Sequence, residues 1–205
     1  MSRFCVYLGS RDGHDPRFLV AARTLGEALA RRGHSLVYGG ARVGMMGELA
    51  DSVLAAGGEV IGVMPDHLVE REQAHLALTR LIRVRNMHER KASMAAHCDA
   101  FIALPGGIGT LEELFEAWTW RYLGLHDKPI GLLDTAGFYS PLLTFLDSTV
   151  EHGFLNARTR QDLLAAEAPE AFRAPRRRPP GTGPGGREHH GASSPSQSAI
   201  SSVRW

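Results

Sequence analysis

Short apolar runs alternate with longer amphipathic segments along most of the chain, and this alternation constrains the fold more than any other feature. The run RFCVYLGS at residues 3–10 is typical of a buried strand, and residues 16–33 follow it with apolar side chains at helical spacing. Buried strands that alternate with helices form parallel sheets covered on both faces. The sequence therefore predicts an α/β fold, a Rossmann-like doubly wound parallel sheet.

The remaining expected elements continue this alternation without an internal repeat. Strands are expected at residues 35–40, 59–65, 81–86, 100–107 and 129–134. Helices are expected at residues 44–58, 87–99 and 139–153, with a further helix opening in the stretch 104–120.

The composition changes near Ala174. From there to Trp205 the chain is rich in Pro, Gly, Ser and Arg, has few apolar side chains and shows no periodicity. Such a segment cannot offset its ordering entropy by burying apolar surface. We therefore expect a single folded domain at residues 1–173 and a disordered tail at residues 174–205.

The composition also narrows the classes of function. Of the 205 residues, 43% are apolar and 22% are charged, and the formal net charge is +1. This balance gives no argument for binding nucleic acid or an anionic membrane. No apolar run is long enough to span a bilayer, and the N-terminus lacks the apolar core of a signal peptide. We expect a cytoplasmic protein whose two cysteines are reduced packing residues.

Three of the expected strands end in small residues. They are followed by Gly9 and Ser10, by Gly39 and Gly40, and by Gly106 and Gly107. In doubly wound sheets, ligands bind outside the carboxyl ends of the strands. Glycines are common in such turns, but three small-residue ends at one edge favour a nucleotide-sized crevice lined by these residues.

The turn after the fifth expected strand reads PGGIGT and opens a helix. It supplies Gly106, Gly107, Ile108, Gly109 and Thr110. Free backbone N–H groups at a helix N-terminus bind anions, and this short loop suits a monophosphate better than a pyrophosphate. Neither GxGxxG nor GxxxxGK[ST] is present, so the sequence predicts neither the usual dinucleotide site nor a Walker-type NTPase.

Glu113 has two possible roles. The stretch TLEE at residues 110–113 has the spacing of a capping box, in which Glu113 returns to the backbone N–H of Thr110. On a helical projection, however, Glu113, Glu116 and Trp120 lie opposite the apolar stripe of the helix. A tryptophan beside two glutamates indicates a face covered by a second subunit or by the wall of a site. Both roles stay open at this point.

The stretch MHERK at residues 87–91 holds two adjacent cations. Lys91 falls in an apolar stripe with Met94 and Cys98, and Arg90 lies at the edge of that stripe. A lysine there needs a partner or a route to solvent. The two cations do not by themselves require a ligand. Lys91 could extend to solvent, and Arg90 could pair with a surface carboxylate. The histidines and cysteines lack metal-site spacing, so no metal is predicted.

Together the two motifs resemble those of a known family. PGGIGTLEE at residues 105–113 matches PGGxGTxxE, and MHERK matches MHxRK. From about Phe4 to about Phe172, the chain resembles the LOG ("Lonely Guy") family of cytokinin riboside 5′-monophosphate phosphoribohydrolases, often described as possible lysine decarboxylases. The chain departs from the family pattern at Ile108, where tyrosine is common.

Two further departures lie at strand ends. Ala41 replaces a third glycine, and Arg11 takes the place of a usual second serine. Arg11 lies near the expected crevice and bears on the base or phosphate contacts there.

The resemblance implies hydrolysis of the N-glycosidic bond of an adenosine-type nucleoside 5′-monophosphate, without a cofactor. It implies that Arg90 and Glu113 form the catalytic pair, that Glu72 and Lys91 contact the substrate, and that the glycine loop with Thr110 holds the 5′-phosphate. It also implies a homodimer or a larger homo-oligomer. The products would be the free base and ribose 5-phosphate.

The residues leave two alternatives to this activity open. A nucleotide-binding or carrier module would use the same crevice without hydrolysis, although binding an anion gains nothing from Glu113. A lysine decarboxylase would need pyridoxal phosphate on a Schiff-base lysine, and only Lys91 and Lys128 are available. The residues favour the hydrolase.

Overall fold

The structure is a computed structural model that describes residues 1–69 and 73–172 of the 205-residue chain. Glu72 and the expected tail at residues 174–205 lie outside the described residues. Seven strands are present in this part of the chain: β1 (Arg3–Tyr7), β2 (Ser35–Tyr38), β3 (Val60–Pro65), β4 (Arg80–Val84), β5 (Ala100–Ala103), β6 (Ile130–Leu133) and β7 (Leu163–Ala166).

The strands are joined by helices that differ in length. The α-helices are α1 (Arg17–Arg31), α2 (Gly44–Ala55), α3 (Met87–Ala96), α4 (Ile108–Tyr122), α5 (Ser140–Glu151) and α6 (Ala157–Gln161). Three short 3₁₀ helices are η1 (Asp66–Leu68), η2 (Thr135–Gly137) and η3 (Pro169–Ala171).

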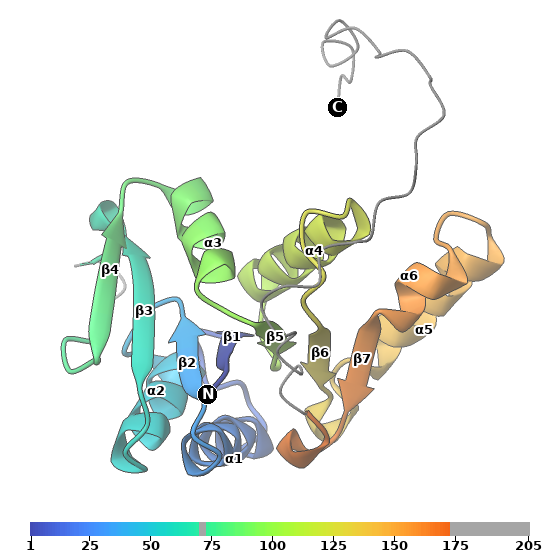
Figure 1. The fold of residues 1–205 in the computed structure, drawn as a ribbon. Coiled ribbons are helices and arrows are strands. Elements are labelled where there is room, and N and C mark those ends of the chain that lie inside the picture. Colours follow the sequence, from blue (N-terminus) through green and yellow to red (C-terminus); the bar gives the residue numbers. More distant parts are fainter. Residues whose placement is uncertain (70–72, 173–205) are drawn as a thin grey trace, which may run out of the picture. The chain divides into compact units, whose positions relative to one another are not determined.

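All seven strands form one parallel sheet in the order β4-β3-β2-β1-β5-β6-β7 (Figure 1). The chain steps outward from β1 to β4, then returns to the middle and steps outward from β5 to β7 on the other side. The direction of travel therefore reverses between β1 and β5. This topology confirms the predicted doubly wound parallel sheet.

Two apolar clusters cover the two faces of the sheet. Along β1, Phe4 and Val6 pack in the cluster that includes the buried side chains of α1 and α2, whereas Cys5 and Tyr7 pack in the cluster of α3, α4 and α5. Figure 1 shows these helices on opposite sides of the sheet. Because both faces of the strands are buried, the strands are continuously apolar in sequence.

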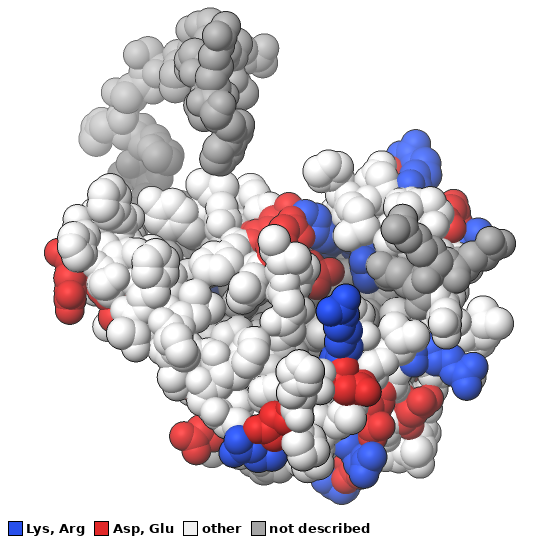
Figure 2. Space-filling view, turned by 180° about the vertical axis from the view of Figure 1, so that it is seen from behind, with Lys and Arg blue, Asp and Glu red and all other residues white. Residues whose placement is uncertain are grey.

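The edge strand β7 and the short helix α6 were not predicted. Leu163 is buried, but Leu164 is exposed, so this four-residue strand carries little of the apolar signal of a central strand. No helix in residues 1–69 and 73–172 has the length and apolar character needed to cross a bilayer. Positive and negative side chains intermix on the face shown in Figure 2, rather than gathering in one basic area.

The central strands β1 and β5 bring two loops together at the carboxyl edge of the sheet. Phe4 pairs with Ala100, and the register continues to Tyr7 opposite Ala103. Just beyond, the N–H of Gly9 donates to the carbonyl of Pro105 (3.1 Å). The loop after β1 and the glycine loop after β5 therefore meet where the strand order reverses, which is where ligands bind in this class of sheet.

Candidate functional site

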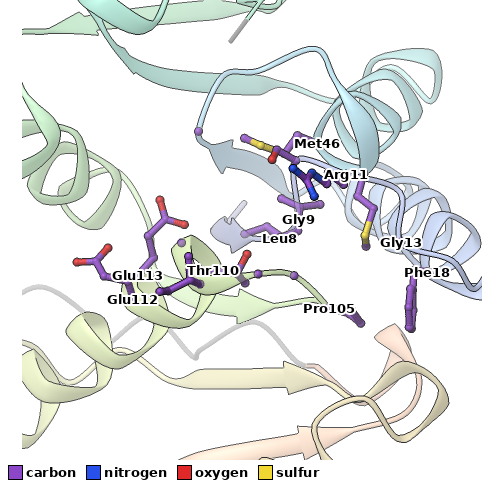
Figure 3. A pocket seen from close by; sticks show the side chains of 18 of the residues that line it. Leu8, Gly9, Arg11, Gly13, Phe18, Met46, Pro105, Thr110, Glu112 and Glu113 are labelled. Atoms are coloured by element: carbon purple, nitrogen blue, oxygen red, sulfur yellow. The ribbon is translucent and has the colours of Figure 1, made fainter. Parts of the chain in front are cut away.

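A cavity of about 600 Å³ opens at the carboxyl ends of β1 and β5. Its walls come from the loop after β1, the end of β2, and the first turns of α2, α3 and α4, with Phe138 at one side. In the close-up view, Glu112 and Glu113 lie at one end of the cavity and Phe18 lies at the other, with Thr110 between them (Figure 3).

The glycine loop presents bare backbone to this cavity. The N-cap of α4 is Gly107, and no side chain caps the helix. A Cβ atom on Gly107 or Gly109 would meet nothing within 4 Å. The first-turn N–H groups of α4 have no intrahelical partners, so this helix start offers the anion-binding arrangement that its sequence predicted.

Gly106 differs from its two neighbours in the loop because it is tightly packed. A Cβ atom there would lie 2.2 Å from Oγ1 of Thr110 and 2.8 Å from the backbone nitrogen of Gly9. The missing side chain lets the loop after β1 and the first turn of α4 close on each other. Gly106 therefore shapes the loop, whereas Gly107 and Gly109 leave room beside it.

The capping-box interpretation of Glu113 is wrong. Helix α4 begins at Ile108, so Thr110 lies inside its first turn rather than at the N-cap position. The Thr110 side chain is buried and lies against Gly106. Because the helix starts three residues earlier than the capping box requires, Glu113 lies in the second turn and lines the cavity.

Glu113 is half-buried beside the interior of β1. Burial raises the pKa of Tyr7 well above its ordinary value, and the charges of Cys5 and Glu113 act in the same direction. Tyr7 also stacks on Phe101, with ring centroids 5.8 Å apart. The carboxylate of Glu113 is thus close enough to act on a buried side chain of the central strand while it lines the cavity.

Arg90 is buried and held by the backbone of two neighbouring strand segments. Its Nε donates to the carbonyl of Val63 within β3 (3.1 Å), and its Nη2 donates to the carbonyl of Gly39 just beyond β2 (3.1 Å). A Cβ atom on Gly39 would lie 2.1 Å from this Nη2. These contacts replace the expected surface carboxylate. They fix the guanidinium in the cavity wall with further N–H groups to donate.

Lys91 faces helix α4 instead of the cavity. Its Nζ donates to Oε1 of Glu112 (2.5 Å) and to Oε1 of Glu116 (3.1 Å). Burial alone would lower the pKa of Lys91, but the two carboxylates outweigh it and raise that pKa. Glu116 on α4 is therefore bridged to α3 of the same chain by Lys91.

The structure brings nine of the expected site residues together around the cavity: Ser10, Gly39, Arg90, Gly106, Gly107, Ile108, Gly109, Thr110 and Glu113. Two expected contacts lie elsewhere. Gly40 packs on Met64 and Leu81, and Lys91 does not line the cavity.

Sequence reasoning missed the aromatic wall. Phe18 and Phe138 line the cavity and meet edge to face with centroids 5.7 Å apart. Phe18 looked like an ordinary core residue of the first helix, and nothing in the local pattern linked it to a residue 120 positions later. In residues 1–69 and 73–172, no three His, Cys, Asp or Glu side chains are grouped so as to hold a metal ion.

Comparison with known proteins adds independent information. Residues 46–174 match the family model described as "Possible lysine decarboxylase". Cytokinin riboside 5′-monophosphate phosphoribohydrolase LOG4 from Arabidopsis thaliana is 48% identical over 80% of this chain and 76% of that protein. Its relative LOG from Oryza sativa subsp. japonica is 48% identical over 80% of this chain and 68% of that protein.

Solved structures share the fold. TM1055, a structural genomics target, superposes with a TM-score of 0.62 at 25% identity, covering 83% of this chain and 95% of that one. The molybdenum cofactor carrier protein of Chlamydomonas reinhardtii gives a TM-score of 0.62 at 24% identity, covering 82% and 91% of the two chains. With the fold, the family model and near 50% identity to curated relatives in agreement, this chain belongs to the LOG family.

Proposed function

We propose that this chain hydrolyses the N-glycosidic bond of cytokinin riboside 5′-monophosphates or AMP and releases the free base and ribose 5-phosphate. One observation carries the proposal. An uncapped helix start, Arg90 and Glu113 line a single cavity of about 600 Å³. Relatives with near 50% identity bear the name of this activity.

The phosphate fits the glycine loop. A phosphate monoester carries close to two negative charges at neutral pH. The start of α4 offers backbone N–H groups and the positive end of the helix dipole, and Thr110 adds a hydroxyl at the same wall. Glu113 lies further along α4, so a nucleotide bound by its phosphate places its sugar toward that carboxylate.

The sugar end fits the chemistry of glycosyl transfer. When the bond between C1′ and the base nitrogen breaks, positive charge develops on the ribose, as it does in glycoside hydrolysis. The fixed carboxylate of Glu113 stabilises that charge and orients the attacking water. The water oxygen bonds to C1′, and one of its protons leaves with the base. Arg90 stays protonated, so its role is to position the ribose or phosphate, not to accept a proton.

A pyridoxal-dependent decarboxylase does not fit the lysines. A Schiff base requires a neutral amine, but the pKa of Lys91 is raised by its two carboxylate partners despite its burial. The Nζ of Lys128 donates to the carbonyl of Ala95 (2.5 Å), and neither lysine lines the cavity. The chain has no other lysine.

We also propose that the chain forms a homodimer or a larger homo-oligomer. Tyr122 and Phe154 are more than half exposed and line a second cavity of about 360 Å³ beside α4 and α5. Exposed apolar surface of this kind marks interfaces. Sedimentation velocity at several concentrations tests the proposal, and a monomer at every concentration would contradict it.

The activity is tested with matched pairs of substrates. AMP, isopentenyladenosine 5′-monophosphate and the two corresponding nucleosides are incubated with the protein, and the free base is measured by chromatography. Each charge-assisted hydrogen bond to the phosphate is worth about 10- to 100-fold, so the nucleotides should release base at least about 10-fold faster. Equal turnover of nucleoside and nucleotide would contradict the role of the glycine loop.

A further inference from the structure

Among residues 1–69 and 73–172, four charged side chains line the cavity, and one of these four makes no ionic or hydrogen-bonded contact. Glu112 binds Lys91, Arg90 donates to two carbonyls, and Glu113 has an electrostatic partner. The exposed guanidinium of Arg11 has no hydrogen bond or ion pair with any residue in the described ranges 1–69 and 73–172. An arginine of this kind in a cavity wall is available to a ligand.

The backbone of Arg11 is held directly beside the glycine loop. A Cβ atom on Gly9 would lie 3.2 Å from the carbonyl oxygen of Arg11 and 3.3 Å from Cα of Gly106. On its other side, the Cα of Arg11 lies 2.9 Å from the position of a Cβ on Gly44, at the start of α2. The loop after β1 is thus fixed between two helix starts, and its arginine shares the cavity with Thr110 (Figure 3).

The charges in the cavity wall indicate that the ligand group for Arg11 is a phosphate. Among the described residues, its lining contains two cations, Arg11 and Arg90, and two carboxylates, Glu112 and Glu113. Within this described set, removing Arg11 would leave one cation against two carboxylates to face a dianionic ligand. Arginine presents a planar fork of donors that matches phosphate oxygens.

We propose that Arg11 binds the 5′-phosphate of the substrate and sets the preference of this chain for nucleotides over nucleosides. The proposal rests on the proposed function for its substrate class. It assigns the phosphate a charged contact that comes from the loop after β1, in addition to the backbone and hydroxyl donors at the start of α4.

Binding of ribose 5-phosphate, measured by calorimetry, tests this contact without requiring turnover. We expect Arg11→Met to weaken binding about 10- to 100-fold and Arg11→Lys to weaken it less, because lysine keeps the charge but loses the fork. Raising the ionic strength should weaken binding more in the unchanged protein than in Arg11→Met. Steady-state rates should show the same loss for AMP and no change for adenosine.

Arg80→Met is the matched control. Arg80 is exposed and is the first residue of β4, so it lies at the amino ends of the strands, whereas the cavity lies at their carboxyl ends. Replacing it with methionine removes the same charge as Arg11→Met does. The control should leave ribose 5-phosphate binding within about 2-fold of the unchanged protein, since a distant surface charge is screened. Thermal unfolding of each variant verifies that it is folded.

The outcomes separate this proposal from the proposed function. Unchanged binding of ribose 5-phosphate by Arg11→Met overturns the role of Arg11, even if AMP is hydrolysed. An equal loss for AMP and adenosine also overturns it, because Arg11 would then act on the sugar or base. If the protein releases no base from any nucleotide, yet Arg11→Met selectively loses ribose 5-phosphate binding, the phosphate contact stands and the hydrolase function fails.

Discussion

Two of the helices that border the cavity, α3 and α4, begin in opposite ways. At the start of α3, Oδ1 of Asn86 accepts the N–H of Glu89 (2.9 Å), and the Glu89 carboxylate accepts the N–H of Arg85 (3.0 Å). At the start of α4, Gly107 provides no side-chain cap. Helix α3 therefore caps one N–H of its first turn with its own side chain, whereas α4 has no side-chain cap and leaves its first N–H groups for another partner.

Because of this difference, the two helices contribute to the cavity wall in different ways. Helix α3 is anchored locally and holds two buried cations, Arg90 and Lys91, in fixed positions. Helix α4 keeps an open end, at a cost in stability that an N-cap side chain would remove. The uncapped N–H groups of α4 are thus more informative about ligand binding than the capped start of α3.

The largest expected effect comes from Glu113→Gln, which removes the proposed charge at C1′. We expect base release from AMP to fall by about 10²- to 10⁴-fold, the usual contribution of a positioned acid–base group. Glu89→Gln is the control in α3, because Glu89 binds Arg85 and does not line the cavity. Full activity in Glu113→Gln would reduce Glu113 to a structural residue.

Gly106→Ala should be the most damaging change to the glycine loop itself. Its methyl group would meet Thr110 and the backbone nitrogen of Gly9, so we expect a loss of about 1–3 kcal/mol in the free energy of unfolding. Gly109→Ala meets no atom within 4 Å and should retain its stability. Denaturant unfolding compares the two. Equal stabilities would show that the loop relaxes freely.

Gly107→Asp gives α4 the kind of cap that α3 already has. Gly107 has a φ of −93° and no atom near its absent Cβ, so the change introduces no strain. We expect a gain of about 0.5 kcal/mol in unfolding free energy together with a roughly 10-fold or greater loss of AMP affinity, because the carboxylate competes for the phosphate site. Asn86→Ala is the opposite change in α3 and should cost about 1 kcal/mol without changing affinity.

The smallest effect concerns the Lys91 bridge between the two helices. Because its pKa is raised in the folded protein, the bridge contributes fully below the ordinary lysine pKa and is lost as pH rises through the raised value. Its carboxylates are partly exposed, so the contribution is about 1 kcal/mol or less. Lys91→Met should therefore lower stability at pH 7 and flatten its decline above pH 10. If stability declined equally above pH 10 in Lys91→Met and in the unchanged protein, the contribution of the bridge would be contradicted.

The sequence predicts the central sheet well because each central strand is a continuous apolar run. It does not predict β7, where Leu164 and Ala165 are exposed and the run is only four residues long. It also gives no order of strands, so the meeting of Gly9 with Pro105 needed the structure. Local patterns describe single elements, whereas strand order depends on contacts between distant segments.

Within the site, the motifs identified most of the cavity wall but not the direction of each side chain. Arg90 and Lys91 are adjacent and similarly buried, yet Arg90 donates to the backbone of β3 and of the turn after β2, whereas Lys91 faces α4. A helical projection cannot distinguish them, because it omits the neighbouring helix. The capping box failed for a related reason: packing against Gly106 places Thr110 inside the helix.

The contact between Gly39 and Arg90 couples two positions of this chain that lie 51 residues apart. A methyl group at position 39 and Nη2 of Arg90 would occupy the same space, and Sδ-linked Cε of Met46 lies only 2.7 Å from that position. Gly39→Ala therefore requires Nη2 of Arg90 and Cε of Met46 to move away from the new methyl group. Positions 39 and 90 are coupled in this way, whereas Arg11 and Ile108 are exposed and can be substituted without moving Arg90.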